Sequence, residues 1–356
     1  MIIYSKSSGL SPAAIGKLET PIKMIIEHES DLLTKKGGTY NTLFNIEKSS
    51  RFGETIVGGN EFDIFRAVAE GAGAENDTLI ETYSKFIEHI QFMKEFTISA
   101  EMMEDANYGV AADAKRRAEN FTRAYYKTMN KICERALAYA TSSSTTYANA
   151  VLDLTAPDGL PLFHCNHKWG SDAYKNGTQS NYFFGDVCCT GDPSTGRILN
   201  ASVFEETLYM LAVQLRNMKD ENGEALCYTA DTIILPGNQP DMEAIIKKVC
   251  GSPYTVGNNN NDINLHYGNW KIVVMPTWQA NDYRFMIMSS EANKNLCGNM
   301  FFNRIPLTIS NWVDNHTGNY IWNGRCRFGV GFGTYKHIIL AVDSYEEIEN
   351  AEVITR

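Results

Sequence analysis

The chain has 356 residues, of which 44% are hydrophobic and 21% charged, and its formal net charge is −10. This is an ordinary globular composition, and the length suffices for two domains or one elaborate domain. Proteins that grip nucleic acid usually cluster Lys and Arg against phosphates. The short basic run Lys115-Arg116-Arg117 is better explained as a solvated helix face, so the composition excludes a sequence-reading nucleic-acid binder.

Targeting signals are not evident in the sequence. No early segment combines a basic start, an apolar run and a small-residue cleavage site, and no apolar stretch approaches the about 18 residues that a membrane span needs. The eight cysteines form no CxxC pair. We therefore expect a soluble protein that is made in the cytosol, with mostly reduced thiols and no membrane partner.

Residues 1 to about 45 predict an extended N-terminal arm. Pro12 and Pro21 interrupt a stretch of small and polar residues, residues 22–33 offer a short amphipathic helix, and Gly37-Gly38 breaks it. This content is too thin to form a core of its own, so we expect the arm to lie on its own chain or on a neighbour's.

Residues 46–99 predict a long β-hairpin. Residues 60–71 and 78–99 have the alternating, β-branched and aromatic content of strands, and residues 71–78 form a glycine-rich tip between them. Because an isolated hairpin is marginal in water, this one needs a partner surface.

Residues 105–141 predict an unusually long helix. It lacks proline, its only glycine is Gly109, and Asp105 or Asn107 can cap its start. About 37 residues at about 1.5 Å each make a rod of about 55 Å, which is either a mechanical spine or a long core helix of an enzyme. An apolar stripe follows the helical period. It comprises Val110, Ala114, Arg117, Phe121, Ala124, Tyr125, Met129, Ile132, Ala136 and Tyr139.

Beyond a polar linker at 142–150, residues 151–300 mix helices and strands and predict one α/β domain. The clearest elements are an amphipathic helix at 201–219, a buried strand at 232–237 and a helix at 239–251. Residues 301–356 read as three further strands.

The best metal-like group is His164-Cys165-Asn166-His167 together with Cys188-Cys189. Zinc takes Cys and His ligands, but adjacent cysteines and an HxxH in a loop do not match common finger spacings. Ordinary loop and core roles are therefore favoured, with zinc as the alternative.

Catalytic patterns are weaker still. Cys165 beside His164 or His167 lacks the surroundings of known cysteine nucleophiles, and Gly329 to Gly333 does not form a phosphate-binding GxGxxG. The acidic pairs Glu205-Glu206 and Glu346-Glu347 resemble solvated faces. The sequence thus predicts no catalytic, cofactor or metal residues, and no enzyme.

Three segments, taken in order with the arm, hairpin and long helix, resemble the major capsid proteins of tailed phages. EFTISAEMMEDANYG leads into the helix, DGLPLFHCNHKWG is similar to a segment that follows it, and MKDENGEALCYTADTIILPGNQPDMEAIIKK resembles a loop, strand and helix of the Mu-type major head subunit. The resemblance covers about residues 40 to 340 and is weakest at the C-terminal end.

This resemblance implies an α+β chain with the Hong Kong 97-type capsid fold. Its parts would be an N-terminal arm (1–45), an extended hairpin loop (46–99), a peripheral domain with the spine helix (100–150) and an axial domain (151–300). The C-terminal strands (301–356) would complete the peripheral domain, and His167 would be structural. Phe121, Tyr125, Met129 and Ile132 would pack on those strands, whereas Lys115, Arg116 and Glu119 would face solvent, the interior or a neighbour.

The implied function is that of a capsid subunit of the virion. Pentamers and hexamers would form an icosahedral shell around packaged double-stranded DNA, without sequence-specific binding. A separate scaffold protein or one already removed, a portal and decoration proteins would be partners, and assembly would occur in the host cytoplasm. Some shells of this fold join a hairpin Lys to an Asn of a neighbour, for which Lys48, Lys85 and Lys94 are the candidates. The rival reading is a cytosolic α/β enzyme or zinc protein that uses the region from His164 to Cys189.

Overall fold

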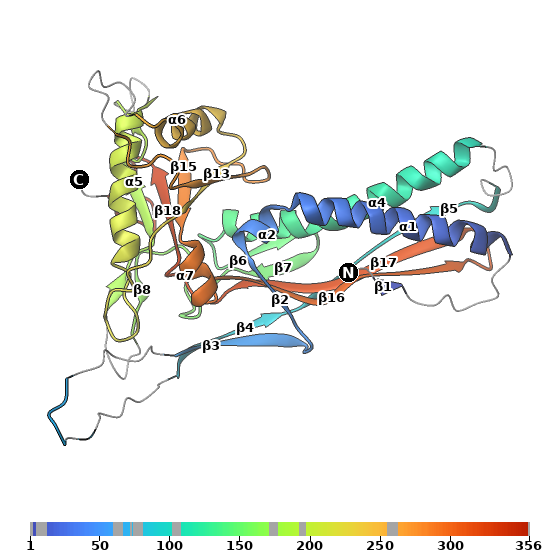
Figure 1. Cartoon of the computed structure of the whole chain (residues 1–356), viewed down its shortest axis with the longest axis horizontal. Coiled ribbons are helices and arrows are strands. Elements are labelled where there is room, and N and C mark those ends of the chain that lie inside the picture. The colour runs from blue at the N-terminus through green and yellow to red at the C-terminus, as the bar shows by residue number, and fades with distance from the viewer. Residues whose placement is uncertain are drawn as a thin grey trace. The chain divides into compact units, whose positions relative to one another are not determined.

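The chain divides into two compact units, each of which is considered by itself (Figure 1). The computed structural model describes residues 3–4, 13–59, 67–71, 73, 81–101, 108–170, 177–191, 197–254 and 263–354. The first unit comprises Met1–Glu54, Ile87–Cys133 and Phe301–Val330. The second comprises Thr55–Phe86, Glu134–Met300 and Gly331–Arg356.

The first unit is built on a five-stranded sheet. Two long strands form its centre, β16 (Asn299–Val313) and β17 (Tyr320–Phe332). On one side β17 pairs antiparallel with β5 (Ile90–Ile98), from Tyr320 opposite Ile98 to Phe328 opposite Ile90. On the other side β16 carries two short strands, β1 (Ile3–Tyr4), which runs parallel to it, and β2 (Asn45–Lys48).

Two long helices lie on this sheet, α1 (Ala13–Lys36) and α4 (Tyr108–Ala138), whose last five residues belong to the second unit. They run side by side in Figure 1 and are joined by an ion pair between Arg123 and Glu29 at 2.6 Å. The core of the unit lies between helices and sheet. Its buried members are Ile22, Ile26, Ile98, Ala114, Ala118, Phe121, Leu307, Ile309 and Trp322.

The helix predicted at 22–33 is confirmed, but it is part of a longer helix of 24 residues, so the expectation of extended chain is wrong for residues 13–21. Pro21 was expected to interrupt the chain, because proline has no backbone N–H to donate to a helix, yet it lies inside α1. Burial of Ile22 and Ile26 against the α4 side chains supplies the stabilisation that helix propensity alone does not. The predicted break at Gly37-Gly38 is confirmed, since Gly37 has φ of +69° and the short helix α2 (Thr39–Leu43) follows.

The long helix is confirmed, with 31 residues in α4. Its expected caps, Asp105 and Asn107, lie outside the described residues. The predicted packing face is also confirmed at its centre, because Phe121 is buried against Leu307 and Trp322, and Tyr125 packs against the same cluster. Met129 and Ile132 are buried as well, whereas Lys115 and Arg116 are exposed.

The second unit is built on a mixed six-stranded sheet in the order β14-β13-β15-β18-β10-β19. In that order the strands are Lys271–Met275, Thr232–Pro236, Arg284–Met288, Ile338–Asp343, Tyr182–Gly185 and Glu352–Val353. The chain-order neighbours β13 and β14 are parallel, and β18 is antiparallel to β15. Assignment of residues 338–343 to the C-terminal strands of the peripheral domain is therefore wrong. Strand β18 is fully buried and completes the sheet of the 151–300 block.

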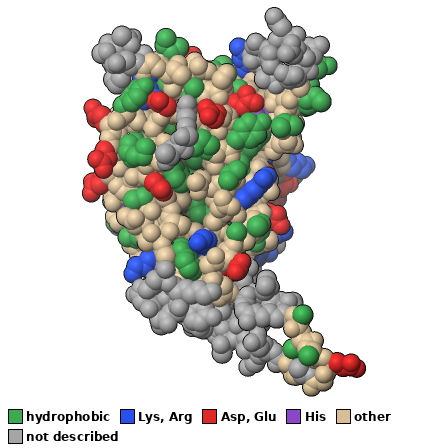
Figure 2. Space-filling model, turned by 90° about the vertical axis from the view of Figure 1, so that its left-hand side faces the viewer, with side chains coloured by type: hydrophobic (Ala, Val, Ile, Leu, Met, Phe, Trp, Pro, Cys, Tyr) green, Lys and Arg blue, Asp and Glu red, His purple; other side chains and the backbone are tan. Residues whose placement is uncertain are grey.

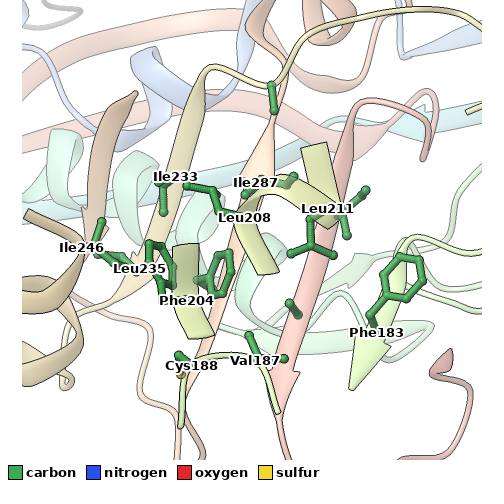
Figure 3. Close-up of a cluster of buried hydrophobic side chains, with 14 of the residues drawn as sticks. Phe183, Val187, Cys188, Phe204, Leu208, Leu211, Ile233, Leu235, Ile246 and Ile287 are labelled. Carbon is green, nitrogen blue, oxygen red and sulfur yellow. The ribbon is translucent and has the colours of Figure 1, made fainter. Parts of the chain in front are cut away.

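Two helices supply apolar side chains to this sheet, α5 (Ala201–Arg216) and α6 (Pro240–Gly251), as predicted from their periodicity. The Asn200 side chain caps α5 by accepting a hydrogen bond from the Ser202 N–H. Figure 3 shows Phe204, Leu208 and Leu211 of α5 directed toward Ile233, Leu235 and Ile287 of the sheet. A third helix, α7 (Ser290–Asn295), follows β15.

The polar linker predicted at 142–150 is instead a β-hairpin of β6 (Ser144–Tyr147) and β7 (Ala150–Asp153). Ala148 and Asn149 have φ of 50° and 61°, which gives the left-handed two-residue turn that suits a hairpin. Four short strands form two more small pairs. These are β8 (His167–Lys168) with β9 (Thr178–Gln179), and β11 (Cys189–Thr190) with β12 (Ile198–Leu199).

The long hairpin contains β3 (Gly53–Gly59) paired with β4 (Glu81–Glu88). The run predicted as one strand at 78–99 divides at His89 into β4 and β5, and β5 joins the sheet of the first unit. The other predicted strand, 60–71, lies mostly outside the described residues. Within the described part of the chain, no helix is long and apolar enough to span a membrane.

Candidate functional site

The His and Cys residues proposed as zinc ligands do not form one cluster. His167 is completely buried, its Nδ1 lies 2.7 Å from Asp158 Oδ2 and its Nε2 lies 3.0 Å from the Leu162 carbonyl. The ring also stacks on Tyr335 at 3.9 Å. Because both ring nitrogens already face protein oxygens, His167 is a structural residue that ties the loop before β8 to itself.

Cys165 and His164 lack the character of a nucleophile and its base. Burial raises the pKa of the Cys165 thiol, and burial lowers the pKa of His164. The His164 Nδ1 accepts a hydrogen bond from the Asn166 N–H at 3.0 Å. These directions oppose the thiolate and imidazolium pair that a cysteine nucleophile requires.

Cys188 and Cys189 lie beside Asp343, a residue that the sequence reading did not single out. Asp343 Oδ2 accepts backbone N–H groups from residues 187, 188 and 189 at 2.8–2.9 Å, and its Oδ1 lies 2.8 Å from Arg197 Nη2. Oδ2 is thus satisfied by three donors and Oδ1 is paired with a guanidinium, and the hydrogen bond to Cys189, together with burial, raises the pKa of the Cys188 thiol. This cluster locks the end of β18 to the turn before β11 and is poorly suited to bind a cation.

The remaining sequence candidates also take structural or surface positions. A Cβ on Gly329 would lie 2.8 Å from the Glu88 carbonyl, and one on Gly333 would lie 2.2 Å from the Cys297 carbonyl, so these glycines permit close backbone packing. Glu206, Glu346 and Glu347 are exposed.

The basic run on α4 is largely neutralised by its own neighbours. Arg116 and Arg117 both bind Asp113, at 2.7 and 2.8 Å. These guanidinium groups hold the pKa of the Asp113 carboxyl below its usual range. The single Asp113 carboxylate offsets one of these two charges and Glu119 lies 3.9 Å from Lys115, so the run keeps only a small net charge for a phosphate backbone.

The three lysines considered for cross-linking differ in their surroundings. Lys48 and Lys94 are exposed, but Lys85 of β4 is buried and its ammonium binds the Asp153 carboxylate and the Thr155 hydroxyl. Partial burial acts to raise the pKa of Asp153, but its bonds to Lys85 and Thr155 lower the pKa overall. The Tyr83 hydroxyl donates to the Gly170 carbonyl at 2.6 Å, so Tyr83 and Lys85 together anchor the hairpin to its own unit.

The opposite side of β4 is exposed and carries Phe86 between Ser84 and Glu88. Phe86 alternates with Lys85 along the strand and is half exposed, as is Val57 of β3. Large exposed hydrophobic side chains also occur on the α/β part of the second unit, and Figure 2 shows such side chains among acidic ones on one face of the molecule.

Charge is distributed unevenly between the units. The first contains 17 Lys and Arg against 14 Asp and Glu, whereas the second contains 15 against 28. The acidic excess of the protein therefore belongs to the unit with the six-stranded sheet. Such a unit repels nucleic acid and copies of itself at low ionic strength.

Comparison with known proteins gives matches among solved structures only. No family model and no curated protein matches the chain. The capsid structure of the cyanophage P-SCSP1u matches with a TM-score of 0.50 at 9% identity, covering 87% of this chain and 89% of that one. A structure of Mycobacterium phage Patience has a TM-score of 0.49 at 14% identity, covering 97% and 92%. The capsid of Ralstonia phage GP4 has a TM-score of 0.48 at 10% identity, covering 86% and 88%.

The protein is therefore an α+β chain with the Hong Kong 97-type capsid fold, the fold that its segment order predicted. The assignment rests on the cyanophage capsid, whose match spans nearly the whole of both chains. The long helix, the paired strands β3 and β4 and the mixed sheet are thus parts of one known architecture.

Proposed function

We propose that this protein is a major capsid protein, which assembles into pentamers and hexamers of an icosahedral shell around double-stranded DNA. The observation that carries the proposal is the match to the cyanophage capsid over 87% of this chain. Two half-exposed apolar side chains of the β3–β4 hairpin, Val57 and Phe86, agree with it, since a neighbouring copy could cover them further. Closed symmetric shells provide such cover by repeating one contact many times.

The parts of the chain take the following roles in this proposal. Residues 1–45 form the N-terminal arm, whose helix α1 lies on the spine helix, and residues 46–99 contain the extended loop. The first unit is the peripheral domain, and residues 151–300 form the axial domain. Because β18 and β19 belong to the sheet of the axial block, we place residues 331–356 with that domain.

Within tailed phages, we place the chain in the branch of the Mu-type major head subunit. The support is the segment DGLPLFHCNHKWG, in which Asp158 and Leu162 bind the buried His167. The Trp169 ring of the same segment lies directly against Gly177 and Gly223, where a Cβ on either glycine would meet the ring. The residues that carry the resemblance therefore contact one another directly.

The proposal includes a set of partners and a location. Copies of the chain, a separate scaffold protein, a portal and decoration proteins would be its protein partners, in a virion assembled in the host cytoplasm. DNA would be enclosed without sequence-specific contacts, which agrees with the net charge of −10 and with the paired arginines of α4. The role is structural and non-enzymatic.

The rival function, an α/β enzyme or zinc protein, has less support. Its candidate ligands lie in His164-Cys165-Asn166-His167 and Cys188-Cys189, but both nitrogens of His167 are engaged by Asp158 and Leu162. Elemental analysis separates the two functions. One equivalent of zinc on the purified protein, lost in a Cys188→Ser variant, would favour the rival.

Negative-stain microscopy tests the proposal directly. The protein is overexpressed alone and with its genomic neighbours, and each preparation is sized by sedimentation and imaged. Rings, tubes or shells are expected in at least one preparation. A small, uniform oligomer in both would contradict the proposed function.

A further inference from the structure

Residues 263–269, which precede Trp270 and β14, form a turn segment of the second unit that lacks a buried apolar side chain. Ile263, Leu265 and Tyr267 are exposed, at 79%, 67% and 53%. The alternate positions, Asn264 and His266, are buried. The segment is therefore anchored by two polar side chains and not by an apolar stripe.

The first anchor, Asn264, is independent of pH. Its side-chain amide donates to the Ser252 carbonyl at 2.9 Å and to the Val249 carbonyl at the end of α6. Its Oδ1 accepts the His266 N–H at 2.9 Å. An amide side chain neither gains nor loses a proton near neutral pH, so these bonds persist when the solution is acidified.

The second anchor, His266, holds the segment only in its neutral form. The Trp270 indole N–H donates to His266 Nδ1 at 3.1 Å. Because an indole N–H can only donate, Nδ1 is the nitrogen without a hydrogen, and Nε2 carries it. Nε2 is buried and has no hydrogen-bond partner among the described residues, and the Tyr209 ring lies 4.4 Å from the imidazole ring.

Protonation of His266 would turn this anchor against itself. A hydrogen on Nδ1 would face the Trp270 indole N–H, so two donors would oppose each other, and the new charge would gain no acceptor at Nε2. Burial lowers the pKa of His266 from its ordinary value of about 6.5. The anchor is thus complete above about pH 6.5 and weakens as the pH falls below that value.

The surrounding charges do not offset this effect. His266 adjoins α5 through Tyr209, α6 through Asn264, and β14 through Trp270. The nearest charged residues on these elements are three acids and three bases, namely Glu205, Glu206, Glu243, Lys247, Lys248 and Lys271. Burial also raises the pKa of Tyr209 and of Cys250, so both stay neutral in acid. Burial is therefore the influence that decides the protonation of His266.

We propose that His266 is an acid-sensitive latch of the second unit. In its neutral form it holds residues 263–269 in place, and its protonation releases them. The exposed Leu265 and Tyr267 then lose their fixed positions, so the latch couples pH to the order of an apolar surface. This regulation goes beyond the proposed function and does not depend on it.

Hydrogen exchange of the full chain, followed by mass spectrometry, tests the latch. Exchange is compared at about pH 7.5 and 5.5 after correction for the intrinsic chemistry, and sedimentation checks that the oligomeric state is the same at both. Exchange of residues 263–269 should become about three- to tenfold faster in acid, since each pH unit below about 6.5 changes the equilibrium by up to about tenfold. Residues 144–153 contain no histidine and are the internal reference.

Three variants separate the latch from a general effect of acid. In His266→Gln the amide oxygen can accept from Trp270 but takes up no proton, so exchange should stay slow at both pH values; if this variant is already open at pH 7.5, His266→Asn replaces it. His316→Gln alters an exposed histidine and should respond like the unaltered protein. Trp270→Phe leaves Nδ1 without its donor, so exchange should be about tenfold faster even at pH 7.5.

Any of three results would overturn the proposal. The first is no acceleration of residues 263–269 in acid beyond that of residues 144–153. The second is an equal acceleration in the His266→Gln protein, and the third is unchanged exchange at pH 7.5 in the Trp270→Phe protein. None of them bears on the proposed capsid function, which is decided by imaging rings and shells.

Discussion

Replacement of Phe121 by Ala should destabilise the first unit more than any change on the solvent side of α4. The Phe121 ring is 7% exposed, belongs to the cluster with Leu307 and Trp322, and lies 5.3 Å from the Phe96 ring. Truncation of a buried Phe costs about 3–5 kcal/mol, of which the aromatic pair accounts for about 0.5–1.5. Typical total stabilities are about 5–15 kcal/mol, so the loss is large, and we expect the unfolding temperature to fall by about 6–20 °C.

A second substitution makes the prediction specific to this packing. A Cβ added to Gly324 of β17 would lie 2.3 Å from Phe121 Cζ, so Gly324→Ala alone should overpack the site and cost about 1–3 kcal/mol. In the Phe121→Ala background the ring is gone, and the added methyl group occupies part of the cavity. The double variant should therefore be more stable than the sum of the two single effects by about 1–3 kcal/mol.

The assay is thermal and urea unfolding of the purified subunit, followed by tryptophan fluorescence. Glu119→Ala is the matched control on the same helix, because Glu119 pairs only weakly with Lys115 at 3.9 Å and Arg123 at 3.8 Å. Surface changes of this kind usually alter stability by less than about 0.5 kcal/mol. Equal effects of Phe121→Ala and Glu119→Ala, or strict additivity with Gly324→Ala, would refute the packing of α4 on β17.

Further predictions concern the second unit. Asp343→Asn should cost about 3–5 kcal/mol, because an amide cannot replace a buried carboxylate that accepts three N–H groups, and Asp282→Asn on the surface should be mild in the same thermal assay. Lys85→Gln should speed hydrogen exchange in β4 at pH 7, whereas Lys94→Gln should not. In the unaltered protein the pKa of Asp153 is lowered, so its bond to Lys85 contributes fully above pH about 4 and is lost as the pH falls below that value, with faster exchange there. Boiled particles should give a single band near the chain mass of 39.9 kDa, since Lys85 is engaged by its own chain, and a ladder of covalent multimers would contradict this.

Local patterns in the sequence predicted the elements that local physics decides. Helix α5 has an apolar stripe at helical spacing and an Asn cap, and β13 is a short apolar run between turn residues, so both are confirmed near the expected bounds. Helix α4 could be predicted for the same reason, because a long stretch without proline and with an apolar face at helical spacing is typical of a helix and not of strands.

The errors arose where distant contacts override local signals. Pro21 predicted a break, but α1 gains burial of Ile22 and Ile26 on α4, about 90 residues away in the chain. The Ser- and Thr-rich stretch at 142–150 was read as a linker, because exposed hairpins carry little apolar periodicity. Two positive φ angles at Ala148 and Asn149 define its turn, and Ala148 gives no sequence signal for such a conformation.

The Asp343 cluster could not have been assembled from sequence spacing. Its donors lie more than 150 positions earlier in the chain and are backbone N–H groups, which every residue other than proline possesses. One signal was available, since Asp343 is a lone carboxylate directly after the apolar run 338–342. A charged residue at the end of a buried strand must find donors or lose its charge.

The uneven distribution of charge bears on how copies of the chain can meet. The second unit has 28 acidic against 15 basic residues, so copies that crowd around an axis by this unit repel one another. Salt screens this repulsion between charges that lie more than about 10 Å apart at 0.1 M. Assembly through this unit should therefore strengthen as salt rises from about 0.01 to 0.1 M, as sedimentation would measure, in contrast to the binding of a basic protein to DNA. Assembly that weakens over this range would contradict a dominant repulsion between copies of the second unit.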